Sequence, residues 1–404
     1  MHSFRAQHLP ALDGLRGVAI LLVITHHQLV PLSLKGGFLG VDIFFVLSGF
    51  LITRLLLQEF EATQSISLTK FYARRVLRLA PALLLYLIAS LVVTYRLHPE
   101  EFGHEIKLVG LALAYLTNWR MALGWDYWLD STSIIWSLSI EEQFYLLWPP
   151  LLLLALSAPI RRSHLKIALT LIVVGIGLHR GVLWAQGADL NRMYYGTDTR
   201  VDAPLMGCLM ALLSASQLKS RTRALLNIGA LASVGCLVWL IVRSTFTDSF
   251  LYREGYTVIA VAAGVLTWSV ADSPESIIGR VLSWYPLRWF GFISYGLYLW
   301  HWLLLRNISF YGMVGEWDTW AKFACAVLVA AASYYLIERR FTKLKTRFGY
   351  AREISMRGSS PTVKEGSPVF SKPSFTVGLL PRERNVTFEA RPTPSLVQTL
   401  DQSS

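Results

Sequence analysis

The chain has 404 residues, of which 53% are hydrophobic and only 16% are charged, and its mean hydropathy is +0.44. Soluble globular proteins carry about 25% charged residues, so this composition excludes a soluble enzyme and a disordered chain. The 38 Lys and Arg against 26 Asp and Glu give a net charge of +12. Apolar runs of about 20 residues, each long enough to cross a roughly 30 Å hydrocarbon core, recur along the chain and predict a polytopic α-helical membrane protein.

Ten apolar runs are predicted to span the membrane. They cover residues 12–30, 38–57, 77–95, 136–157, 165–184, 200–215, 224–243, 255–271, 290–308 and 320–337. An eleventh run, Leu108 to Leu116, is too short to cross, and we expect a re-entrant or interfacial segment that is buried in protein. The predicted fold class is all-α, with about ten transmembrane helices plus one short re-entrant or interfacial segment.

Orientation follows from the positive-inside rule. With the N-terminus inside, the inner connections hold the basic clusters at 74–78, 161–162 and 219–223, while acidic residues gather outside. This arrangement predicts that both termini are cytoplasmic and that most of the positive charge fixes topology, so no nucleic-acid partner is expected. Residues 1–340 form the predicted membrane domain. Residues 341–404 are rich in Ser, Pro and Thr and are predicted to be a largely disordered cytoplasmic tail.

The cysteines give no sign of a metal site or a disulfide. Cys208, Cys236 and Cys325 all lie inside apolar runs, without a CxxC pair or a histidine at metal-ligand spacing. We therefore expect three small buried side chains and no bound metal.

Ionisable residues inside apolar spans are costly, and they are candidates for function. In the first span, Arg16 and His27 are eleven residues apart, so they share a helix face at a separation of about 16 Å. Arg16 then lies near the cytoplasmic mouth and His27 in the outer half, where a neutral imidazole could take a proton from an acceptor hydroxyl. The alternative is a histidine satisfied by a neighbouring helix.

The second span places Asp42 at about the depth of His27 on an antiparallel neighbour. This predicts an Asp42–His27 contact that orients the imidazole, as in a His–Asp dyad. The nearby Ser48-Gly49 pair favours close helix packing through small residues over a nucleophile.

A basic segment precedes the third span. Arg74 and Arg78 are at i and i+4, so their guanidinium groups are predicted to emerge on one helix face at the cytoplasmic surface. Forked donors suit phosphate or pyrophosphate, although simple membrane anchoring is the alternative. With Arg16 nearby, a cytosolic ligand that carries a polyphosphate becomes the better interpretation.

Three further polar groups lie in or next to later spans. Glu141 and Glu142 lie near the start of the fourth span. Carboxylates inside a membrane helix must face a water-filled cavity, a base or a cation. Because the two residues are adjacent, their side chains cannot both face the same way. Before the sixth span, the charged residues of 198–202 could bind sugar hydroxyls or form a self-satisfied network of salt bridges. His301 lies toward the outer end of the ninth span, in an aromatic stripe typical of an interfacial belt.

Taken together, these segments resemble the motifs of the acyltransferase 3 family, the membrane-bound O-acyltransferases. The matching segments are Leu12–Gly17 with His27, Gly40–Thr53, Phe71–Pro81, Trp136–Pro149, Thr197–Ala203, Ser294–Trp302 and Ile337–Phe341, and they follow the family's order over residues 10–341. The resemblance implies an enzyme of the bacterial inner membrane that moves an acyl group, expected to be acetyl, from cytosolic acyl-CoA to a hydroxyl, usually on a carbohydrate.

The resemblance also implies roles for residues, position by position. Arg16 and His27 match the family's catalytic Arg-x10-His pair, and Glu141 matches the acid of the Trp-Ser-Leu-x-x-Glu motif; Asp42 joins this predicted catalytic set. The predicted donor-binding residues are Arg74, Arg75 and Arg78, and the predicted acceptor-binding residues are Asp198, Arg200, Asp202, Tyr295 and His301.

Two features depart from the family pattern. Arg340 stands where the last motif commonly has Pro, and the segment after 341 is too short for the soluble hydrolase-like domain that some members append. Transfer is therefore expected to finish within the membrane domain, with acyl-CoA as a co-substrate and no bound cofactor.

Two alternatives stay open. A transporter or flippase could use His27, Asp42 and Glu141 as a proton relay, and an acyl-handing subunit could leave the acceptor chemistry to a partner protein. The expected partners of the enzyme itself are the acyl-CoA donor, a carbohydrate or glycolipid acceptor and the lipid bilayer. The acceptor's identity, the acyl chain and the oligomeric state are not specified by the sequence.

Overall fold

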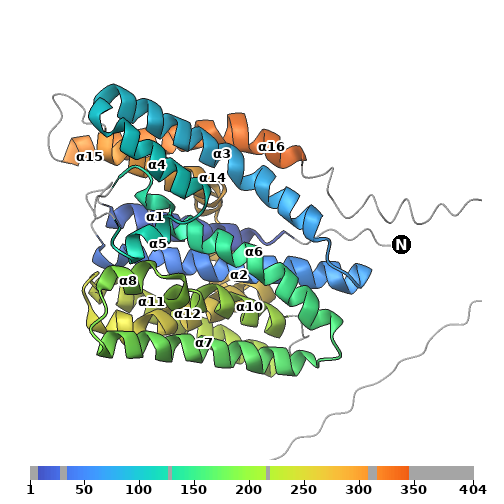
Figure 1. Ribbon diagram of the computed structural model, residues 1–404. Helices are drawn as coiled ribbons and strands as arrows, with labels where there is room; N and C mark the ends of the chain where they lie inside the picture. Colours follow the sequence, from blue (N-terminus) through green and yellow to red (C-terminus); the bar gives the residue numbers. More distant parts are fainter. Residues whose placement is uncertain (1–7, 28–33, 126–129, 215–218, 308–315, 345–404) are drawn as a thin grey trace, which may run out of the picture. The chain divides into compact units, whose positions relative to one another are not determined.

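The computed structural model describes residues 8–27, 34–125, 130–214, 219–307 and 316–344. All regular secondary structure in these ranges is helical, which confirms the all-α prediction for this part of the chain (Figure 1). The predicted tail beyond residue 344 lies outside the described residues.

Ten helices coincide with the predicted spans. They are α1 (Pro10–His26), α2 (Gly40–Thr63), α3 (Leu68–Leu97), α6 (Trp136–Ser157), α7 (Arg162–Ala185), α10 (Asp202–Ser214), α11 (Ser220–Arg243), α12 (Tyr256–Asp272), α14 (Tyr285–Asn307) and α15 (Glu316–Ser333). The short α-helices are α4 (Phe102–Leu113), α5 (Thr117–Ala122), α8 (Leu190–Tyr195), α9 (Thr197–Arg200), α13 (Ile277–Leu282) and α16 (Arg339–Leu344). Three 3-10 turns (Lys35–Leu39, Pro99–Glu101, Ser133–Ile135) and two π-helical turns (Leu251–Gly255, Tyr334–Glu338) adjoin them.

Among the described residues, six segments are long and apolar enough to cross a membrane, which supports a membrane protein. These segments are Lys35–Thr63, Leu68–Leu97, Arg162–Ala185, Ser220–Arg243, Leu251–Asp272 and Trp317–Leu344. Helix α10 is apolar but only 13 residues long, so a count of ten spans stays a prediction. Helix α4 has 12 residues and a length of about 18 Å, too short to cross.

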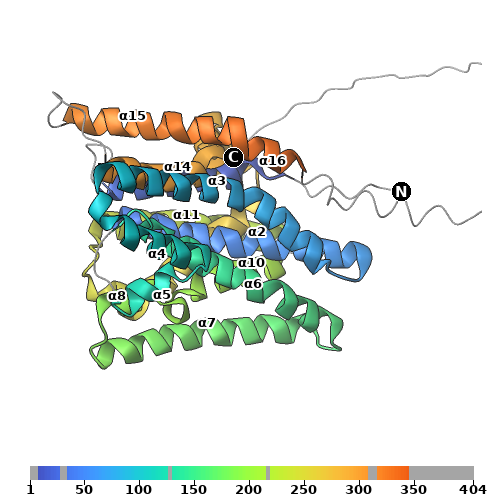
Figure 2. The same cartoon turned by 45° about the horizontal axis from the view of Figure 1, so that its top comes forward.

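The long helices lie side by side, with α1 and α2 in the interior of the bundle (Figures 1 and 2). Helix α1 packs on α14 and α2, and α14 packs on α15. On its other side α2 packs on α10 and α12, which contact α7 and α11 respectively. This order buries α1 and α2, which carry Arg16 and Asp42, and His27 directly follows α1.

Glycines allow the central helices to approach closely. A Cβ at Gly17 of α1 would collide with the backbone carbonyl of Leu287 on α14, and a Cβ at Gly49 of α2 would collide with that of Pro204 on α10. The predicted use of Ser48-Gly49 for helix packing is therefore confirmed for Gly49, because backbone contact of this kind requires a residue without a side chain.

Replacing a glycine at such a contact should destabilise the bundle. Gly17→Ala has to push α1 away from α14, and overpacking of this kind costs about 1–3 kcal/mol. Gly175→Ala on α7 is the matched control, since a Cβ there meets nothing within 4 Å. Thermal unfolding of the purified variants should show a lower midpoint for Gly17→Ala only, and equal midpoints would contradict the packing described.

Candidate active site

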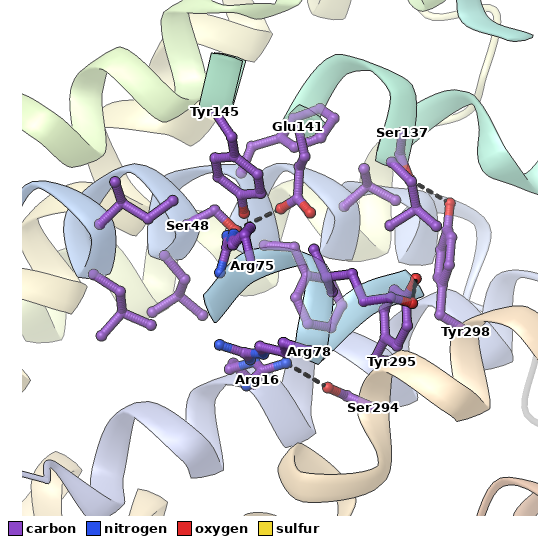
Figure 3. Close-up of a pocket in the computed structure, with 18 of the residues that line it drawn as sticks. Arg16, Ser48, Arg75, Arg78, Ser137, Glu141, Tyr145, Ser294, Tyr295 and Tyr298 are labelled. Carbon is purple, nitrogen blue, oxygen red and sulfur yellow. Dashed lines mark hydrogen bonds between the residues drawn. The ribbon is translucent and has the colours of Figure 1, made fainter. Parts of the chain in front are cut away.

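A cavity of about 220 Å³ lies between α1, α2, α3, α6 and α14 (Figure 3). Its apolar wall comes mainly from α2, and its polar side chains come from the other four helices and from Ser48. The charged residues that line it are Arg16, Arg75, Arg78 and Glu141. Three cationic groups and one acid in a mostly apolar cavity are the pattern of a site for an anionic ligand.

The three arginines reach the cavity from two helices. Arg16 of α1 donates through Nη2 to Ser294 Oγ at 3.1 Å, and the Arg75 guanidinium lies 3.7 Å from the centroid of the Tyr145 ring. Figure 3 shows Arg78 beside Arg16 and below Arg75. Arg78 has no hydrogen bond or ion pair with any described residue. The convergence of Arg16 with the basic segment, predicted from the sequence, is present in the structure.

Arg74 differs from its two neighbours. Its Nη2 lies 3.6 Å from Oε2 of the buried Glu59, near the end of α2, and it does not line the cavity. Arg74 and Arg78 are one helical turn apart, as predicted, but the side chain of Arg74 turns to Glu59, so Arg75 and Arg78, at i and i+3, are the arginines of α3 that line the cavity.

Glu141 faces the arginines across the cavity. Ser48 Oγ donates to Glu141 Oε1 at 2.5 Å, which joins α2 to α6 (Figure 3). Glu142 does not line the cavity, so the expectation that the two neighbouring carboxylates face different ways is confirmed. Glu141 is the only acid among the cavity-lining residues that the structure describes.

Helical spacing would have revealed several polar residues that the sequence analysis missed. Ser137, Glu141 and Tyr145 follow one another at four-residue intervals on α6, and Ser294 and Tyr298 do so on α14. Such intervals place side chains on one helix face.

Tyr295 and Tyr298, both on α14, line the same cavity as the arginines. Tyr295 donates to the Leu79 carbonyl at 3.0 Å, so its place is beside the predicted donor site. Tyr298 donates to the Ile134 carbonyl at 3.0 Å and therefore accepts from Ser137 Oγ at 2.6 Å. Its ring also faces His301, with the centroids 5.9 Å apart. Tyr298 thus stands between the cavity and His301.

His27 follows the last residue of α1 and does not line the cavity. Its Nδ1 lies 3.1 Å from Nε2 of His301, and its ring packs against Trp302 with the centroids 5.2 Å apart. His301 is fully buried, so the expectation that it belongs to an interfacial aromatic belt is wrong.

The predicted contact between Asp42 and His27 is also wrong. Asp42 Oδ1 instead accepts from Arg200 Nη2 at 2.8 Å, and both side chains are 1% exposed. Depth along a helix does not fix its rotation, and Asp42 faces α10 and the residues before it, away from α1. The Arg200 guanidinium also lies 3.8 Å from the centroid of the Tyr256 ring.

The remaining predicted acceptor residues form ion pairs. Asp202 is buried and bound to Arg180 at 2.9 Å. Asp198 is partly exposed and accepts from Arg192 at 2.6 Å and from His179 at 3.1 Å. Although burial by itself raises the pKa of Asp198, these hydrogen bonds outweigh it and lower that pKa below its ordinary value. Arg200 and Asp202 thus belong to buried salt bridges, in which Arg200 Nε and Nη1 and Asp42 Oδ2 have no hydrogen-bond partner among the described residues.

The Asp42–Arg200 pair predicts a characteristic pattern of stability. Removing either partner leaves a buried charge unpaired, so Asp42→Leu and Arg200→Met should each cost about 3–5 kcal/mol. The double variant should regain much of this loss, because an apolar pair can replace a buried ion pair. Unfolding midpoints test the coupling, and additive losses would contradict it. Acyl transfer by the folded double variant would show that Asp42 has no part in the chemistry.

Comparison with known proteins shows the family to which the chain belongs. The model of the family described as an acyltransferase domain, Acyl_transf_3, matches residues 9–339. The chain therefore belongs to the acyltransferase 3 family, as its motifs predicted. The matched range includes every residue that lines the cavity, together with His27 and His301.

Several individual proteins are similar to this chain over most of its length. The chain is 37% identical to the protein YrhL of Bacillus subtilis, 35% identical to the peptidoglycan O-acetyltransferase OatA of Listeria monocytogenes and 32% identical to the O-acetyltransferase OatA of Staphylococcus aureus. The alignments cover 82–85% of this chain but 55–58% of the relatives, so the chain spans a little over half their length. No solved structure matches significantly.

Proposed function

We propose that this chain is a membrane-embedded O-acetyltransferase that moves an acetyl group from acyl-CoA to a hydroxyl of a carbohydrate-containing acceptor. The observation that carries the proposal is the cavity in which Arg75 and Arg78 of α3 meet Arg16 of α1, the helix that ends next to His27. In keeping with the positive-inside rule, we place the protein in the bacterial inner membrane with about ten spans and both termini in the cytoplasm.

The donor is acyl-CoA in this proposal. Arg75 and Arg78 lie within the first three turns of α3, near its predicted cytosolic end, where guanidinium groups can bind the phosphates of the nucleotide. The volume of about 220 Å³ is below the 300–1,000 Å³ of ordinary ligand pockets. The cavity therefore holds part of the donor, with the phosphates at its arginines and the adenosine extending outside it. The apolar wall of α2 suits the pantetheine arm.

His27 is the proposed general base. It takes the proton from the acceptor hydroxyl as the oxygen attacks the thioester carbonyl; the C–S bond then breaks, CoA leaves as a thiolate, and the imidazolium returns the proton to it. Because Tyr298 separates the cavity from the histidines, the acyl end of the donor has to pass this side chain. Isolation of an acyl-histidine would replace direct transfer by a two-step route.

The acceptor class comes from the relatives' names. All three relatives are named as O-acetyltransferases, two of them for peptidoglycan, so we propose a cell-wall glycan as the acceptor. It would approach from the side at which α1 ends, near the partly exposed Asp198.

Purified protein in detergent, supplied with radiolabelled acetyl-CoA and soluble peptidoglycan fragments, tests the activity. We expect CoA release that depends on the acceptor, together with alkali-labile label on the glycan. Proton-coupled flux of a substrate across proteoliposomes without CoA release would instead favour a transporter, and CoA release only with a second protein would favour an acyl-handing subunit.

A further inference from the structure

His301 makes two hydrogen bonds that together determine its tautomer. Its Nδ1 lies 2.9 Å from the carbonyl oxygen of Leu297, and its Nε2 lies 3.1 Å from Nδ1 of His27. The ring is fully buried on α14. In the described part of the chain, no carboxylate hydrogen-bonds to either ring. A buried imidazolium without an acidic partner is costly, so the resting pair is neutral.

The donor and acceptor roles then follow one from another. A carbonyl oxygen can only accept, so Nδ1 of His301 carries the hydrogen, and the lone pair of its neutral ring is on Nε2. That lone pair can only accept, so Nδ1 of His27 must donate to it. The neutral ring of His27 therefore carries its own lone pair on Nε2, away from His301.

We infer that His301 is a positioning residue that fixes His27 in the Nδ1–H tautomer and thereby leaves Nε2 of His27 as the base. The inference rests on the proposed function and adds an orienting group to it. The tautomer of a histidine is set by the hydrogen bond that its other nitrogen makes, and here a neutral imidazole takes the place that a carboxylate has in a His–Asp dyad.

The same contact also supports the charged state of His27 during the reaction. After Nε2 accepts the proton of the acceptor hydroxyl, Nδ1 continues to donate to His301, and a hydrogen bond from a charged donor is stronger than one from a neutral donor. Trp302 also packs against the His27 ring and is itself fixed by a hydrogen bond from its Nε1 to the Asp130 carbonyl at 2.8 Å. No net charge has to be buried in the resting state.

The tautomer can be observed directly. Full-length protein labelled with ¹⁵N-histidine, in lipid vesicles near neutral pH, would be measured by solid-state NMR, and the spectrum of His27→Gln would assign the His27 signals. We expect a neutral His27 with hydrogen on Nδ1. In His301→Phe, which keeps a ring but has no acceptor, the hydrogen should move at least in part to Nε2.

Two further variants sharpen the experiment. His26→Phe is the matched control, since His26 touches the His27 ring but bonds to the Lys35 carbonyl, and it should leave the His27 tautomer unchanged. In acetyl transfer, His301→Phe should lower kcat at least tenfold with little change in the KM for acetyl-CoA. His301→Gln, whose amide oxygen can accept from Nδ1, should restore part of the lost kcat.

The outcomes separate this inference from the proposed function. A His27 that carries its hydrogen on Nε2 in the wild type, or that keeps the Nδ1–H form in a folded His301→Phe, would overturn the positioning role. Full transfer activity in His27→Gln would overturn the general base itself, whatever the tautomer.

Discussion

His27→Gln is expected to lower the rate of acetyl transfer by roughly 10²–10⁴-fold, the usual contribution of a general base. Glutamine keeps a polar side chain of similar length but cannot take the acceptor's proton. Donor binding should be unaffected, because His27 does not line the cavity that holds the arginines. The measurement is kcat and the KM for acetyl-CoA with a glycan acceptor.

Two controls make this result specific to the chemistry. His164→Gln on α7 replaces an exposed histidine far along the chain from the site and should leave both constants unchanged. Equilibrium binding of CoA to His27→Gln should match that of the wild type. Loss of binding together with loss of turnover would show that His27 supports the structure instead of taking the proton.

The second large effect is expected from the arginines of the cavity. Arg75→Gln and Arg78→Gln should each raise the KM for acetyl-CoA by roughly ten- to hundredfold, since a hydrogen bond to a charged group contributes about 1.5–3 kcal/mol. If the arginines bind phosphate, acetyl-pantetheine, which lacks the nucleotide, should be used equally well by the variants and the wild type.

Arg223→Gln is the matched control for charge. Arg223 is a half-exposed residue near the start of α11, on the same predicted side of the membrane, and it pairs with Asp272. Its replacement removes one positive charge outside the cavity, so the KM for acetyl-CoA should stay within about twofold. An equal rise in all three variants would indicate general electrostatic attraction. An unchanged KM in Arg75→Gln and Arg78→Gln would exclude the cavity as the donor site.

Much of the fold was predictable because hydropathy reports directly on spans. Where the structure describes them, the ten predicted ranges fall on helices, and the short run at 108–116 belongs in part to the 12-residue α4. In the part of the chain that the structure describes, six segments meet the length and apolarity expected of a span, and α10, for example, has only 13 residues. The sequence pattern cannot show whether such helices cross the membrane fully.

The site was predictable where residues lie close in sequence. Arg16 and the basic segment are both predicted to lie at the cytoplasmic end of the bundle, and this shared position predicted that they lie close together. Partners that are distant in the chain were not predictable. His27 and His301 are separated by 274 residues, and no local pattern pairs them.

Helix rotation explains why the predicted contact between Asp42 and His27 is wrong. Asp42 has the expected place in α2, but the face it occupies turns toward Arg200. The hydrogen bond between Ser48 and Glu141 also could not be predicted from the sequence, since it joins α2 to α6 across 93 residues. Both contacts depend on packing that single-sequence spacing does not encode.

The central claim is that one membrane domain carries the acetyl group from CoA on the side of Arg78 to a hydroxyl on the side of His27. Sealed membrane vesicles of known orientation, with radiolabelled acetyl-CoA on one side and glycan acceptor on the other, test it most directly. We predict labelled glycan only when acetyl-CoA is on the predicted cytosolic side and the acceptor opposite, with the label lost in His27→Gln. Equal labelling when both substrates share either side, or CoA release without labelled glycan, would contradict the account.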